Sequence, residues 1–79
     1  MKLPRDLSGS ELISALKRLG YKQTRQTGSH VRMTITITRE AHLTVPLTRA
    51  IPAGTLAALI KDVSAHLETT VDEVLSRIR

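Results

Sequence analysis

At 79 residues the chain is long enough for one small domain, spanning residues 1–79, and it has no cysteine for a disulfide or a thiolate metal site. Its 12 Lys and Arg against 7 Asp and Glu give a formal net charge of +5, which favours a polyanionic partner such as nucleic acid, although Tyr21 is the only aromatic side chain that can stack on a base. No apolar run approaches the roughly 18 residues that a membrane span requires, and the first six residues are too polar for a secretory signal, so we expect a cytoplasmic protein that does not enter a membrane.

The first predicted helix begins after Ser8. The segment from Ser8 to Glu11 has the spacing of a capping box, in which the hydroxyl and the carboxylate each satisfy a free backbone amide. Gly20 marks the end of the helix, since glycine adopts the left-handed conformation that commonly terminates one. One stripe of the helix is apolar and is expected to face the core: Leu12, Ile13, Leu16 and Leu19.

Three antiparallel strands are predicted next, over residues 21–26, 30–38 and 42–47. The first is almost wholly polar, so its pattern does not show which face is buried. Thr27-Gly28 is predicted to form the first hairpin turn, because glycine supplies the positive φ that such turns require. Residues 39–41 are predicted to form a three-residue second turn.

The second strand alternates strictly between apolar and polar side chains. Its predicted inward residues are Val31, Met33, Ile35 and Ile37, and counting back in the same parity places His30 on the open face. A three-residue turn would set Ile37 opposite Leu43 and Ile35 opposite Val45. The same register separates His30 from His42 by eight residues, roughly 26 Å, so the two histidines are not expected to act as a catalytic pair.

A second helix is predicted to start between Pro52 and Thr55, and a third one after Thr70, where a second capping box ends at Glu73. The apolar stripe of the second helix consists of Leu56, Leu59, Ile60, Val63 and Leu67. The predicted fold class is therefore α+β, a two-layer α-β-β-β-α(-α) sandwich with the polar face of the sheet left open. Double-stranded RNA-binding domains have the same order of elements.

His30 is the candidate catalytic residue. RNA carries its own nucleophile in the 2′-hydroxyl, so a cleaving enzyme needs a base to remove that proton and cations to stabilise the phosphate. Imidazole has an unperturbed pKa of about 6.5, which suits a base near neutral pH. The alternative interpretation is an exposed histidine without a role.

Three cations are candidate phosphate contacts: Arg25, Arg32 and Lys61. The alternative for each is an ordinary solvated basic surface. Ser29 either bonds to substrate or closes the turn, and we favour the turn. His42 and His66 are expected to be surface residues, and no metal site or other cofactor is predicted, because the three histidines are scattered and no carboxylate cluster accompanies them.

Several short motifs, taken together and in order, resemble the HicA toxin family. They are Leu7-Ser8-Gly9-Ser10-Glu11-Leu12-Ile13, Leu19-Gly20-Tyr21, Arg25-Gln26-Thr27-Gly28-Ser29-His30, Thr44-Val45-Pro46, and Gly54-Thr55-Leu56 with Ile60-Lys61. The resemblance implies a fold similar to the double-stranded RNA-binding domain and a metal-independent ribonuclease that cleaves mRNA. It also implies that His30 is catalytic, that Gly28 and Ser29 form its turn, and that a HicB-like antitoxin binds the toxin in a hetero-oligomer.

Three positions differ from what is common in that family. Members often carry a histidine two residues after the Val-Pro pair, where this chain has Thr48, and many have an arginine where it has Ala57. The aromatic residue that frequently follows Gly-Ser-His is also missing. These differences remove a possible second proton donor, one cation and one stacking group. The alternative function is therefore a non-catalytic module of the same fold that binds RNA or the antitoxin.

Overall fold

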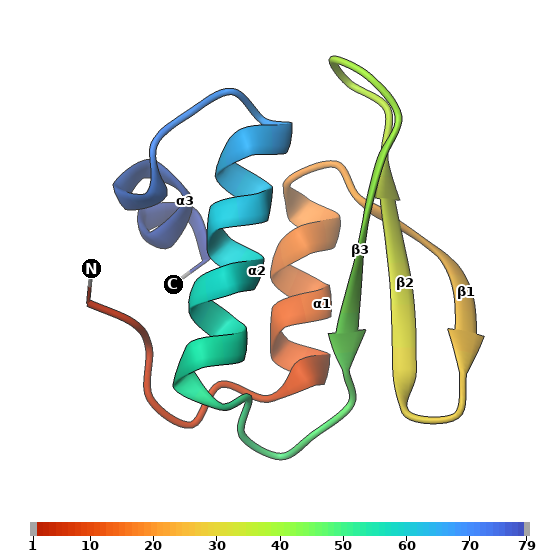
Figure 1. Cartoon of the computed structure of the whole chain (residues 1–79), viewed down its shortest axis with the longest axis vertical. Coiled ribbons are helices and arrows are strands. Elements are labelled where there is room, and N and C mark those ends of the chain that lie inside the picture. The colour runs from red at the N-terminus through yellow and green to blue at the C-terminus, as the bar shows by residue number, and fades with distance from the viewer. Residues whose placement is uncertain (1, 79) are drawn as a thin grey trace.

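A computed structural model describes residues 2–78 of the chain. The elements follow one another as α1 (Gly9–Arg18), β1 (Lys22–Thr27), β2 (His30–Ile35), β3 (Ala41–Pro46), α2 (Ala53–His66) and α3 (Val71–Ile78). The strands form one antiparallel sheet in the order β1-β2-β3 (Figure 1). This arrangement confirms the predicted α+β fold class.

Helix α1 starts as predicted. The Ser8 hydroxyl accepts a hydrogen bond from the Glu11 amide at 3.0 Å, and the Glu11 carboxylate accepts one from the Ser8 amide at 2.9 Å. These two bonds lower the pKa of the Glu11 carboxyl group, because they favour its charged form. At the start of α3 the Thr70 hydroxyl accepts from the Glu73 amide at 3.1 Å, so half of the second predicted capping box is present.

The β1–β2 hairpin turns at Gly28 and Ser29, one residue later than predicted, and Thr27 pairs with His30. Gly28 has a φ of 57°, which a two-residue hairpin turn accepts readily at its first central position. All six residues of β1 are exposed, because this edge strand lies away from the helices (Figure 1). The polar pattern of the first strand therefore reflects a strand with no buried face.

The predicted register of the second hairpin is wrong by four residues. Met33 lies opposite Leu43 and Ile35 lies opposite Ala41, so β2 ends at Ile35 and residues 36–40 form the connection. Ile37, predicted to lie in the core, is 67% exposed. The Thr38 hydroxyl instead donates a hydrogen bond to the His66 carbonyl at 3.0 Å, which ties the connection to the end of α2.

The register was predicted wrongly because the alternation of apolar and polar residues in a strand has a period of two. A register shift by an even number of residues keeps every apolar side chain on the same face, so the pattern accepts both registers equally. The inward face of β2 is therefore as predicted at Val31, Met33 and Ile35, all of which are buried.

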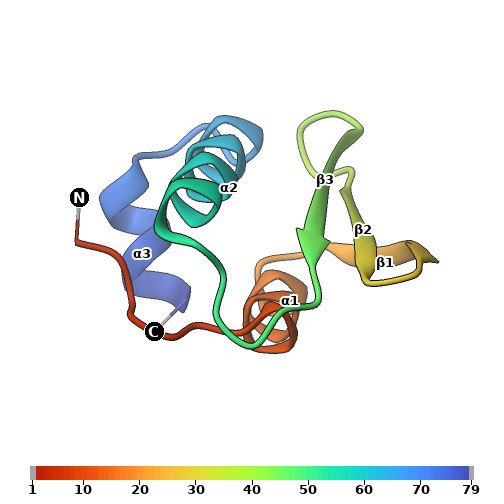
Figure 2. The same ribbon diagram turned by 60° about the horizontal axis from the view of Figure 1, so that its bottom comes forward.

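The core lies between this covered face and the helices. Helices α1 and α2 both contact β3, and α3 packs against both helices (Figures 1 and 2). The fully buried large side chains are Leu12, Leu16, Tyr21, Val31, Met33, Ile35, Val45, Leu56, Ile60, Val63 and Val74. The outward residues of β2 and β3 are exposed or half-buried.

His66 is not the simple surface residue that the sequence suggested. It is half-buried, and its Nδ1 lies 2.8 Å from the Tyr21 hydroxyl. Burial lowers the pKa of His66 and raises the pKa of Tyr21, so the structure favours neutral forms of both side chains. The pair links the start of β1 to the end of α2.

We expect this pair to make the protein less stable in mild acid. The folded state lowers the pKa of His66 below the unfolded value of about 6.5, so the unfolded chain binds more protons as the pH falls through that value. The melting temperature of the wild type should therefore fall between about pH 7 and pH 5.5, and by more than that of a His66→Gln variant. Parallel melting curves of the two proteins over this range would contradict the prediction.

Candidate active site

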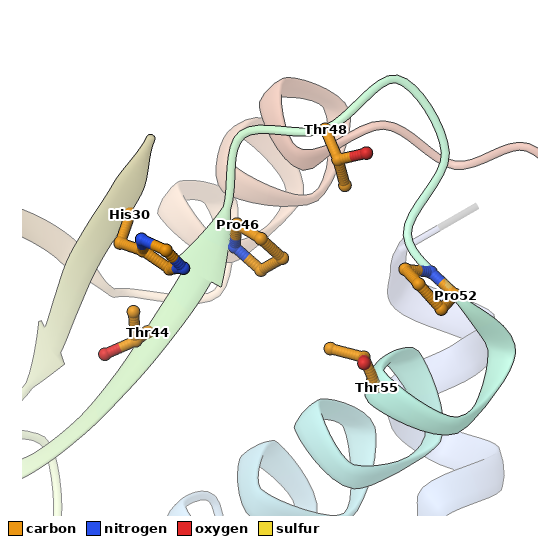
Figure 3. A pocket seen from close by; sticks show the side chains of 6 residues that line it. All are labelled: His30, Thr44, Pro46, Thr48, Pro52 and Thr55. Carbon is orange, nitrogen blue, oxygen red and sulfur yellow. The ribbon is translucent and has the colours of Figure 1, made fainter. Parts of the chain in front are cut away.

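A cavity with a volume of about 540 Å³ lies beside His30. Three separate segments meet there: the start of β2, the end of β3 with its following loop, and the start of α2 (Figure 3). The lining residues are His30, Thr44, Pro46, Thr48, Pro52 and Thr55. Of these six, only His30 has an ionisable side chain.

The hairpin turn holds His30 in place. His30 is the first residue of β2 and pairs with Thr27 on one side and Pro46 on the other. The carbonyl of Ser29 accepts a hydrogen bond from the Leu47 amide at 2.6 Å, which fastens the end of β3 to the turn.

Gly9 sets the path of the chain beyond β3. Its amide donates to the Thr48 carbonyl at 2.9 Å, and a Cβ built on Gly9 would overlap the carbonyl oxygen of Pro46. Only a residue without a side chain allows the two backbones to approach this closely. Gly9 thereby positions Pro46 and Thr48, which form one wall of the cavity.

Helix α2 begins at the opposite wall. Its N-cap is Pro52, which forms no side-chain cap, and its first turn contains no acidic residue. The first amides of such a helix remain free, and the helix dipole adds a partial positive charge at this end. The start of α2 is therefore electrostatically suited to a cavity that receives an anionic substrate.

Two of the predicted phosphate contacts lie near His30. Arg25 pairs directly with Arg32, and Arg32 pairs with Thr44, in the row of the sheet next to the one that holds His30. Both arginines are exposed on the open face. The ion pairs found within residues 2–78 are His42 with Glu40 and Arg77 with Glu73, so neither arginine is neutralised by an acidic side chain there.

Lys61 is not brought to this site. It is exposed on α2, six residues after Thr55, and does not line the cavity. At 3.6 residues per turn, these two side chains point about 120° apart around the helix axis. Gly28 also lies outside the cavity and contributes through the turn.

The corrected register brings His42 closer to His30 than predicted. His42 pairs with Thr34 and His30 pairs with Pro46, a separation of four residues, or about 13 Å along the strand. His42 Nδ1 lies 2.8 Å from the Thr34 hydroxyl, and its Nε2 lies 3.3 Å from the Glu40 carboxylate. His42 is therefore engaged with its neighbours and does not line the cavity beside His30.

Sequence reasoning missed Thr44, Pro52 and Thr55 as parts of the site. Each comes from a different segment, and nothing in the local pattern distinguishes it from an ordinary strand or helix-start residue. Two signals were available: Thr44 belongs to the outward-facing residues of its strand, and Thr44 and Thr55 both stand in motifs that carry the family resemblance. Within residues 2–78, no three His, Asp or Glu side chains gather as metal ligands, and no helix combines the length and apolar character needed to cross a membrane.

We expect Gly9→Ala to disturb the cavity through the fold. The added methyl group must displace the Pro46 carbonyl, and overpacking of this kind typically costs about 1–3 kcal/mol. Gly54→Ala is the matched control, since a Cβ on Gly54 meets no atom within 4 Å and alanine is the better helix former. Denaturant melts should therefore show a loss of stability for Gly9→Ala and none for Gly54→Ala.

Comparison with known families bears on the same residues. The family model described as the HicA toxin of bacterial toxin–antitoxin systems matches residues 9–64, about seven tenths of the chain. The match runs from the start of α1 into the last turn of α2 and includes every residue that lines the cavity. No curated protein and no solved structure matches the chain.

Proposed function

Because the chain belongs to the HicA toxin family of bacterial toxin–antitoxin systems, we propose that it acts as an endoribonuclease that cleaves mRNA, with His30 as its general base. The observation that carries the proposal is the position of His30, exposed at the mouth of the cavity while the neighbouring side chains of β2 are buried. The strand thus presents an accessible imidazole near Arg25 and Arg32, which form no ion pair within residues 2–78.

In the proposed reaction His30 accepts the proton of a ribose 2′-hydroxyl. The resulting oxygen attacks the adjacent phosphorus, the bond to the 5′ oxygen breaks, and a 2′,3′-cyclic phosphate is left on one product. The departing 5′ oxygen takes a proton from water or from the imidazolium. No metal ion is needed in this scheme, because the nucleophile belongs to the substrate.

Arg25 and Arg32 are proposed to hold the phosphate and to stabilise the charge that develops on it. Positioned cations act most strongly where charge appears in the transition state. Their support is geometric, since they occupy the row next to His30 and have no acidic partner within residues 2–78. Lys61 lies too far around α2 to join them, so we assign it no part in this reaction.

One observation favours the alternative function. Thr48 occupies the cavity wall where members of this family often have a histidine, and a threonine hydroxyl is a poor acid near neutral pH. A protein of this fold without turnover would still bind RNA or an antitoxin. Denaturing gels separate the two functions, since a binding module retards RNA in a native gel but does not shorten it.

His30→Ala should abolish most of the cleavage while leaving the fold intact. The side chain is exposed, so its removal should change the unfolding free energy by no more than about 0.5 kcal/mol. The rate should fall by roughly 10² or more, the usual contribution of a positioned general base. Lys17→Ala, on α1 and outside the cavity, is the control and should retain activity. A folded His30→Ala protein that cleaves RNA at the wild-type rate would end the assignment.

We also propose that the antitoxin is a HicB-like acidic protein that covers the His30 face. A domain with a formal charge of +5 and an open polar sheet face favours a partner of opposite charge, mainly through faster association. Association rates measured at increasing salt should therefore fall, and co-expression of the adjacent gene should protect cells. If that gene product neither binds nor protects, the pairing is wrong.

A further inference from the structure

We infer that the open face of the sheet is a track for a single RNA strand, which runs along β2 from His30 towards Lys22 and places successive phosphates over successive rows of side chains. The inference rests on the proposed function, because it assigns the ends of the track relative to His30. It adds Lys22 to the site and gives the bound RNA a direction.

The strand pairing divides the open face into three rows. They are Thr27, His30 and Pro46; then Arg25, Arg32 and Thr44; then Lys22, Thr34 and His42. Neighbouring rows are two residues apart along β2 and along β3, or about 6.6 Å. This spacing is close to that of consecutive phosphates along an extended RNA strand, so three rows match three nucleotides.

The charges on this face point to an anion. Arg25 lies directly opposite Arg32, an arrangement that is destabilising when nothing separates the like charges. Within residues 2–78 neither arginine forms an ion pair, and the one acidic side chain near the third row, Glu40, is engaged with His42. A phosphate between the two guanidinium groups would remove the repulsion.

A β-bulge at Thr24 brings Lys22 to the same face. Gln23 pairs with Met33 and Arg25 pairs with Arg32, so Thr24 is an extra residue in β1. If Thr24 were paired regularly, with the turn unchanged, Lys22 would lie opposite Ile35 on the covered face. Because Thr24 is bulged, Lys22 lies opposite Thr34.

The bulge also explains why Tyr21 and Arg25 lie on opposite faces of the sheet. Tyr21 and Arg25 are four residues apart, so a regular strand would place both side chains on one face. In the structure Tyr21 is 2% exposed in the core, whereas Arg25 is on the open face. The Thr24 hydroxyl lies 2.8 Å from that of Thr34 and 3.4 Å from the Arg32 carbonyl, contacts that hold the bulge against β2.

The track has a direction because its two ends differ. Beyond Lys22 the open face continues towards the 36–40 connection, whereas beyond His30 stand the hairpin turn and the wall of the cavity formed by Pro46 and Thr48. Nucleotides on one side of the cleaved bond therefore meet the row of Arg25 and Arg32 and then Lys22, whereas those on the other side leave the sheet at the hairpin turn. An unspecific basic surface would favour neither side.

The first test uses single-stranded oligonucleotides with one cleavage site, lengthened by one, two or three nucleotides on either side. The inference expects kcat/KM to rise with the first two nucleotides added on one side and to stay flat on the other. Lys22→Ala should remove only the gain from the second nucleotide, and Arg25→Ala should remove the gain from the first. Equal gains on both sides would overturn the inference.

The second test measures RNA binding in the absence of cleavage. Binding of the same oligonucleotides is measured with His30→Ala as background, at several salt concentrations. Each of Lys22→Ala and Arg25→Ala should reduce the slope of log K against log salt concentration by about 1, whereas Lys17→Ala, an exposed lysine on α1, should not.

The outcomes of the two tests distinguish the two proposals. If the wild type cleaves no RNA but the binding pattern holds, the proposed function fails and the track stands. If Lys22→Ala and Arg25→Ala bind like Lys17→Ala, the track is wrong, whatever the enzyme cleaves. Circular dichroism of each variant confirms that it is folded before it is compared.

Discussion

The strict alternation of β2 is the constraint on which both the core and the candidate site depend. Val31, Met33 and Ile35 are buried in the core. Because successive side chains of a strand point to opposite faces, His30 and Arg32 point outwards. A slip by one residue would bury the histidine and expose the core, so the hydrophobic effect holds the register of the site. The proposed chemistry therefore occupies the open face of the same strand that anchors the core.

The second requirement is that three distant segments meet beside His30. The Ser29 carbonyl binds the Leu47 amide, and the Gly9 amide binds the Thr48 carbonyl, so the loop after β3 is fixed at two points. From there the chain reaches Pro52, where α2 begins with free amides. The cavity is thus built largely by backbone contacts, which tolerate changes in the side chains that line it. Thr48, where a histidine is common in the family, is one such change.

Both proposed partners are anionic, so the distribution of positive charge on the surface decides where each of them binds. RNA would use the open face of the sheet, and an acidic antitoxin covering His30 would occupy part of the same surface. Under these two proposals inhibition needs no conformational change, because competition for the same cations is enough. The contact between the buried Tyr21 and the half-buried His66 lies at the other end of β1 and stabilises the fold.

The sequence by itself determined the local features of this protein: the order of elements, the cap of α1, and the outward direction of His30. Each follows from a short-range rule, either a capping bond within four residues or a period of two or 3.6. Family motifs added the expectation of a toxin, which the matched region supports. The tertiary structure alone decided the second register, the exposure of Ile37, the half-burial of His66 and the separation of Lys61 from the site. These depend on contacts between residues far apart in the chain, and an alternating pattern accepts any even shift, so only packing against the helices chooses among the registers.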